Sequence, residues 1–87
     1  TRVLFMTNVD HLPAFARDAH DAMMAAWDAL IDSTLQREAP AMEAELIRQG
    51  KSAAEAAQGA ETHVARIRAA MQIERARLEA EAVQRWQ

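Results

Sequence analysis

Histidine, aspartate and hydroxyl side chains are the residues of this sequence that could carry chemistry. The histidines are His11, His20 and His63, and no two of them are three or four residues apart. Two ligands on one helical face need that separation, as in the His-x-x-x-His and Glu-x-x-His motifs of zinc and di-iron proteins. The histidines therefore predict no metal site, and we expect them at a surface or an interface.

Nucleophilic catalysis requires a serine, threonine or cysteine beside an oriented base. The chain has no cysteine, and its hydroxyl side chains have simpler roles as helix caps or helix-surface residues. Gly50 and Gly59 are nine residues apart, which is not the pattern of a phosphate-binding loop. The aspartates of the first expected helix share a face that should be solvated; they are Asp18, Asp21, Asp28 and Asp32. We therefore expect neither an enzyme nor a bound cofactor.

Size and charge narrow the class of protein. A chain of 87 residues forms at most one domain. The formal net charge of -3 argues against a free-standing nucleic-acid binder, because such proteins are usually basic. No run of 18 apolar residues exists, so we expect no membrane span and a cytoplasmic location.

The composition predicts an all-α fold, because alanine, leucine, glutamate, arginine, glutamine and methionine dominate and no segment alternates with a period of two. A first helix should span about 10–38, with Asp10 as its cap and Pro13 in its first turn. Pro40 disfavours helical geometry at the preceding residue, so we expect the first helix to end near residue 38. A short second helix should follow over about 41–49, with Gly50 as its C-terminal cap.

Ser52 and Glu55 form a capping-box pattern, which predicts a long third helix over about 53–86. Gly59 within it indicates a kink or a close approach of another backbone. The third helix should fold back antiparallel on the first, so that 10–87 form one helical domain. Residues 1–9 are expected to be a disordered or non-native segment.

Apolar residues form more surface than one small hairpin needs. The first helix carries two adjacent stripes: Leu12, Phe15, Ala19, Met23, Ala26 and Leu30; and Met24, Trp27, Ile31 and Leu35. The third helix carries one stripe: Ala60, Val64, Ile67, Met71, Leu78, Ala82 and Trp86. We expect these stripes to meet in the core of a homodimeric helical bundle.

The segment 50–68 resembles part of the bacterial helix-turn-helix regulators. GKSAAEAA at 50–57 is similar to their first helix, and THVARIR at 62–68 is similar to the start of a recognition helix. The resemblance implies DNA contacts by Lys51, His63, Arg66 and Arg68. The turn lacks the aliphatic residue that usually packs there, and cap chemistry alone explains the segment as a stopped helix followed by a capped one.

The function favoured by these observations is a non-enzymatic interaction module that binds a larger protein and inhibits or recruits it. Tryptophan is enriched at binding hot spots, and we expect partner contacts at Trp27, Ile31, Leu35 and Trp86. The alanine- and arginine-rich composition is typical of GC-rich bacteria and of their phages or plasmids, which suggests a small regulator from such a source. The alternatives are a DNA-binding transcriptional regulator that uses 50–68, and a structural subunit that assembles head to tail.

Overall fold

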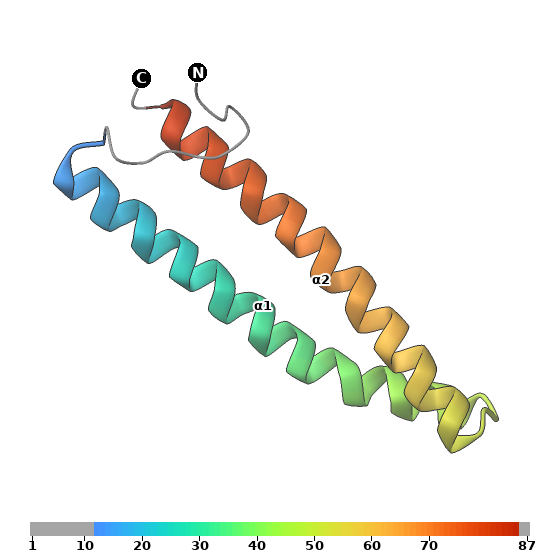
Figure 1. Ribbon diagram of the computed structural model, residues 1–87. Coiled ribbons are helices and arrows are strands. Elements are labelled where there is room, and N and C mark those ends of the chain that lie inside the picture. Colours follow the sequence, from blue (N-terminus) through green and yellow to red (C-terminus); the bar gives the residue numbers. More distant parts are fainter. Residues whose placement is uncertain (1–11, 86–87) are drawn as a thin grey trace.

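The computed structural model describes residues 12–85, and two long helices account for nearly all of them (Figure 1). Helix α1 spans Ala14–Arg48 and helix α2 spans Ala53–Gln84. They lie side by side and antiparallel, so the predicted all-α hairpin is confirmed. The radius of gyration is 18.0 Å, against about 12 Å for a compact chain of this length. The hairpin is therefore a long single layer with two open faces.

Helix α1 begins later than the sequence predicts. Pro13 is its N-cap, with φ of -58° and ψ of 154°, and no side chain caps the helix. The carbonyl of Pro13 accepts the first bonds, from the amides of Ala16 at 3.0 Å and Arg17 at 2.9 Å. A proline ring holds φ in this range and offers no N–H, which suits it to this boundary. Asp10, the expected cap, lies outside the described residues.

The predicted break at Pro40 is wrong, and with it the separate helix over 41–49. Pro40 lies inside α1, which continues to Arg48. Proline removes one backbone hydrogen bond and crowds the preceding turn. The carbonyl that loses its partner belongs to Gln36, an exposed residue, so water can bond to it. Packing of the flanking turns against α2 outweighs the preference of proline against a helix interior. The fold therefore has two helices instead of three.

The connection between the helices follows the predicted cap chemistry. Gly50 has φ of +93°, the left-handed conformation that glycine adopts without strain. The amides of Gly50 and Lys51 donate to the carbonyls of Ile47 and Leu46, both at 3.0 Å, which makes a Schellman motif. Ser52 and Glu55 then form the full capping box of α2. Each helix end thus satisfies its own free backbone groups within a short turn.

Helix α2 is continuous through Gly59, so the turn that the helix-turn-helix alternative needs within 50–68 is absent, and the favoured interpretation, a stopped helix followed by a capped one, is observed. Residues 58–61 are helical and contain no turn. The glycine instead permits close packing against α1, because a Cβ at this position would clash with the Cδ1 atom of Leu46. The atom that approaches Gly59 belongs to the side chain of Leu46, and not to another backbone as the sequence suggested.

The core comes mainly from the second stripe of α1, and at the open end it also includes Leu12 of the first stripe, Ala16 and Val83. Met24, Ile31 and Leu35 are buried, and Ala56 and Ala60 of α2 are buried with them. Phe15 and Leu30 of the first stripe are exposed, with 66% and 48% of their surface accessible. Within residues 12–85 no large side chain is completely buried, because two helices cannot surround one. The structure holds one chain, so the homodimer remains a prediction.

Candidate interaction surface

Three polar pairs join the two helices and fix their register. His20 Nε2 lies 3.3 Å from Glu79 Oε2, and His63 Nε2 lies 3.1 Å from Glu38 Oε1. Between these pairs, Arg75 Nε donates to Asp28 Oδ1 at 2.9 Å. An ionised carboxylate only accepts, so each histidine donates from Nε2. The histidines expected at an interface thus lie between the two helices of one chain; His11 is outside the described residues.

His20 is a polar residue in a small apolar core. Its exposure is 6%, and its Nδ1 atom has no hydrogen-bond partner. A buried polar atom without a partner destabilises a fold by about 1–3 kcal/mol. The hydrogen bond between His20 and Glu79 offsets part of this penalty and holds these two residues, one on each helix, at the same level of the hairpin. We therefore assign His20 a structural role in the alignment of the hairpin.

Leu30 and Ile73 form an exposed apolar pair opposite the Asp28–Arg75 ion pair. Leu30 lies two residues after Asp28, and Ile73 lies two residues before Arg75, which in each case is about 200° around the helix. Because the helices are antiparallel, both steps run toward the turn, so Leu30 and Ile73 lie at the same level. Leu30 is 48% exposed and Ile73 is 71% exposed. Each therefore faces solvent, on the side of its own helix that is turned away from the ion pair.

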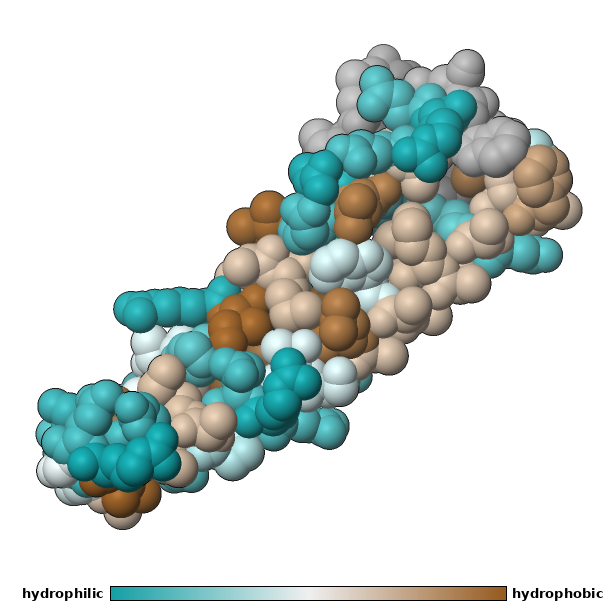
Figure 2. All heavy atoms as spheres, turned by 180° about the vertical axis from the view of Figure 1, so that it is seen from behind, coloured by the Kyte–Doolittle hydropathy of each residue, from teal (hydrophilic) through white to brown (hydrophobic). Residues whose placement is uncertain are grey.

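This surface, here called the apolar face, extends along both helices. Met23 lies seven residues before Leu30, and Ala80 lies seven residues after Ile73, so both share the face. Small residues fill the intervening turns: Ala26, Ala69 and Ala70. Figure 2 shows one side of the molecule, on which apolar and small side chains lie along both helices with hydrophilic groups among and beside them.

Arginines border the apolar face toward the turn. Arg37 lies seven residues after Leu30, and Arg66 lies seven residues before Ile73, so both are on the same side and at the same level. Both are exposed, and neither has an ion-pair partner within residues 12–85. Two unpaired cations therefore stand beside the exposed apolar pair.

Arg77, on the open-end side of Ile73, is paired with two carboxylates of its own helix, so the group carries one net negative charge. It pairs with Glu74 and Glu81, one turn before and one turn after it. The hydrogen bond from Arg77 lowers the pKa of the Glu74 carboxyl, and the same bond raises the pKa of the arginine. The positive charge of the apolar face is therefore concentrated at Arg37 and Arg66.

The residues predicted to contact a partner lie mostly elsewhere. Ile31 and Leu35 are buried in the core of the hairpin, and Trp27 is half-buried. Trp86 lies outside the described residues. Ile73 was not singled out from the sequence. Its signal was that this large apolar residue lies off the apolar stripe of its helix and should therefore be exposed. Leu30 was also placed in the core, although the two stripes of α1 are alike in composition.

The residues expected to contact DNA do not gather on one surface. His63 is paired with Glu38 between the helices. Arg66 and Arg68 are two residues apart on a continuous helix and therefore point to opposite sides. Lys51 lies in the turn, about 22 Å along the axis from Arg66 at 1.5 Å per residue. The arrangement offers no common face for a DNA backbone to contact all four.

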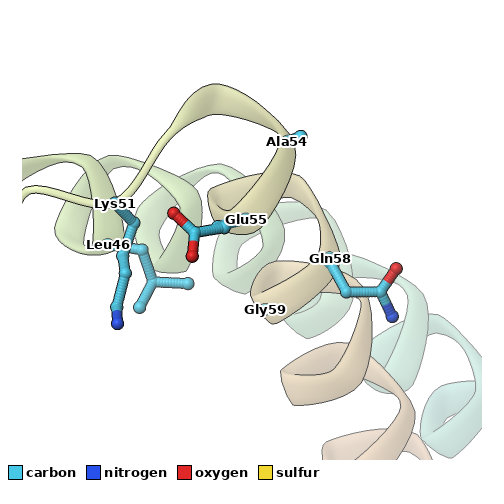
Figure 3. A pocket seen from close by; sticks show the side chains of 6 residues that line it. All are labelled: Leu46, Lys51, Ala54, Glu55, Gln58 and Gly59. Atoms are coloured by element: carbon cyan, nitrogen blue, oxygen red, sulfur yellow. The ribbon is translucent and has the colours of Figure 1, made fainter.

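Two hollows lie at the ends of the hairpin. At the turn end, an open hollow of about 490 Å³ is lined by Leu46, Lys51, Ala54, Glu55, Gln58 and Gly59 (Figure 3). At the other end, a hollow of about 260 Å³ is lined by Phe15, Ala19, His20, Met23 and neighbouring residues. Met23 belongs to the apolar face, so this second hollow continues it.

Other kinds of site find no support in the described residues. Between Leu12 and Arg85, no three histidine, cysteine, aspartate or glutamate side chains are grouped as a metal ion would require. Neither α1 nor α2 contains a segment apolar enough and long enough to cross a membrane. Comparison with protein-family models, curated proteins and solved structures finds no match to this chain.

Proposed function

We propose that the hairpin is a non-enzymatic interaction module that binds a larger protein through its apolar face. The observation that carries the proposal is the exposed pair of Leu30 and Ile73, two large aliphatic side chains at one level of the hairpin. Exposed apolar surface beyond scattered single side chains marks interaction sites in soluble proteins. Binding alone can inhibit a partner by occupying its surface or recruit it to another protein.

The total surface supports the same proposal. The chain exposes 6304 Å². A compact monomer of 9.7 kDa would expose about 5,100 Å². The excess of about 1,200 Å² is comparable to the roughly 800 Å² that each partner contributes to a standard protein interface. The chain therefore exposes enough surface for an interface of ordinary size.

Site-specific photo-crosslinking tests the proposal. A photoreactive phenylalanine analogue replaces Ile73 in one variant and Arg68, on the other side of α2, in the control variant. Both are irradiated in cells of the natural host, and the products are identified by mass spectrometry. A defined protein captured from position 73 and absent at position 68 supports the module. Equal capture at both positions, or none at either, contradicts it.

A further inference from the structure

The inward faces of the two helices are in phase across the turn. Ile31 and Leu35 of α1 are buried core residues, and so are Ala56 and Ala60 of α2. Ile31 lies 25 residues before Ala56, and Leu35 lies 25 residues before Ala60. A continuous helix with 3.6 residues per turn completes about seven turns in that interval. If residues 49–52 were helical, the two buried stripes would therefore form one stripe on one side of a single straight helix.

Residues that face each other also lie at matching distances from the turn. Glu38 lies 12 residues before Gly50. Its partner His63 lies 12 residues after Lys51. The other two interhelical pairs lie at 22 and 24 and at 30 and 28 residues from the same two positions: Asp28 with Arg75, and His20 with Glu79. Two straightened copies laid antiparallel about a twofold axis between Gly50 and Lys51 would therefore bring each residue to its present partner, supplied by the other copy.

Straightening the turn changes few backbone angles. Gln49 already has helical angles, with φ of -79° and ψ of 0°, and no proline follows Pro40 in the sequence. Gly50 must leave its φ of +93°, and Ser52 must leave its ψ of 164°. The straightened chain loses the Schellman motif and the capping box, but its continuous helix gains backbone hydrogen bonds across residues 49–52. Because an antiparallel pair retains the contacts between α1 and α2, the two forms differ mainly in this short segment.

We infer that the turn is a latch between the closed hairpin and an opened form, in which two copies pair as antiparallel straight helices and each α1 packs against the α2 of the other copy. Each opened chain would be helical over residues 14–84, which is 71 residues or about 107 Å, about twice the length of α1. Mass action makes the balance depend on protein concentration. The inference uses only contacts between the helices, so it is independent of the proposed binding role.

Gly50→Ala tests the latch at the residue that closes it. A Cβ at this position would meet no atom within 4 Å, so alanine changes only the backbone preference. Alanine is unfavourable at φ of +93° and favourable in a continuous helix, and both effects act in both copies. We expect the dimerisation constant from sedimentation equilibrium to rise by about thirtyfold or more. Lys51→Ala, in the same turn at a residue without positive φ, is the control and should change it by no more than about threefold.

A thiol crosslink identifies which copy supplies each helix. The chain has no cysteine, so Glu38→Cys combined with His63→Cys places one thiol on each helix, at positions whose side chains now meet. A short bis-maleimide reagent should join the two thiols within one chain at low protein concentration. At high concentration, and in the Gly50→Ala background, it should join two chains, which then run as a covalent dimer on a denaturing gel. Circular dichroism confirms that each variant is helical.

The outcomes separate the opened pair from other assemblies. A Gly50→Ala dimer that is crosslinked between chains, and about twice as long as the monomer by small-angle X-ray scattering, supports the latch. A dimer whose crosslinks stay within each chain consists of two closed hairpins and would overturn the inference. A protein that stays monomeric with and without Gly50→Ala would overturn it as well. Equal dimerisation of Gly50→Ala and Lys51→Ala would show that φ at Gly50 does not set the balance, which also contradicts the latch.

Discussion

Pro40 provides a direct test of how α1 is held together. In a helix interior, proline is less favourable than alanine by about 3 kcal/mol, because it lacks an N–H and crowds the turn before it. Pro40→Ala would restore the bond to the Gln36 carbonyl. It would also loosen the unfolded chain, which lowers the gain by about 0.4–1 kcal/mol. The exposed position adds no packing loss, so we expect stability to rise by about 2 kcal/mol.

The gain is large enough for routine thermal unfolding. For a domain of this size, 1 kcal/mol corresponds to about 5 °C in Tm, so Pro40→Ala should raise Tm by about 10 °C. Ala44→Pro is the matched control, an exposed residue one turn later on the same helix, and it should lower stability by about 3 kcal/mol. The reasoning is refuted if Pro40→Ala leaves Tm unchanged or lowers it. The proline would then be required to direct Met42 and Leu46 onto α2.

Three further predictions test the core, the buried histidine and the turn. Leu35→Ala should destabilise the fold by about 2–4 kcal/mol and Leu30→Ala by about 1 kcal/mol or less, as measured by urea unfolding; equal losses would mean that the stripes are misassigned. His20→Leu should be neutral or stabilising by about 1 kcal/mol, whereas Glu79→Ala, which leaves the imidazole without its acceptor, should cost about 1–3 kcal/mol; a large loss in His20→Leu would contradict the reasoning that the burial penalty of the imidazole exceeds the gain from its bond to Glu79. The pKa of Glu55 is lowered, chiefly by the hydrogen bond from the Ser52 backbone amide. The ionised Glu55 carboxylate therefore stabilises the folded state above the ordinary glutamate pKa, and this stabilisation is lost as pH falls through the lowered pKa. The stability difference between the natural protein and Glu55→Gln should therefore close below about pH 4, and a difference independent of pH would contradict this reasoning.

The sequence predicted best what depends on neighbouring residues. The turn at Gly50 and the capping box of Ser52 and Glu55 need only local backbone and side-chain chemistry, and both were expected. Pro40 was misread because its local penalty is outweighed by packing of the turns on either side, which a local rule does not include.

The apolar face was harder to predict for a geometric reason. Both stripes of α1 contain similar residues, and only the register between the helices decides which one is covered. That register depends on pairs such as Asp28 with Arg75, which are 47 residues apart in sequence. Ile73 is exposed because it lies off the stripe that α2 turns toward α1. The positions of these residues relative to each other follow from the hairpin as a whole.

The constant antiparallel register also has a kinetic consequence. Contacts between the helices grow steadily more distant in sequence from the turn outward: His63–Glu38 spans 25 residues, Arg75–Asp28 spans 47, and His20–Glu79 spans 59. Once an inner contact has formed, the next one closes at most 12 additional residues on each side instead of the whole loop, so its entropic cost is smaller. The hairpin therefore assembles outward from Gly50 and opens in the reverse order. Amide hydrogens near Ala16 and Val83 should exchange with solvent before those near Leu46 and Gly59.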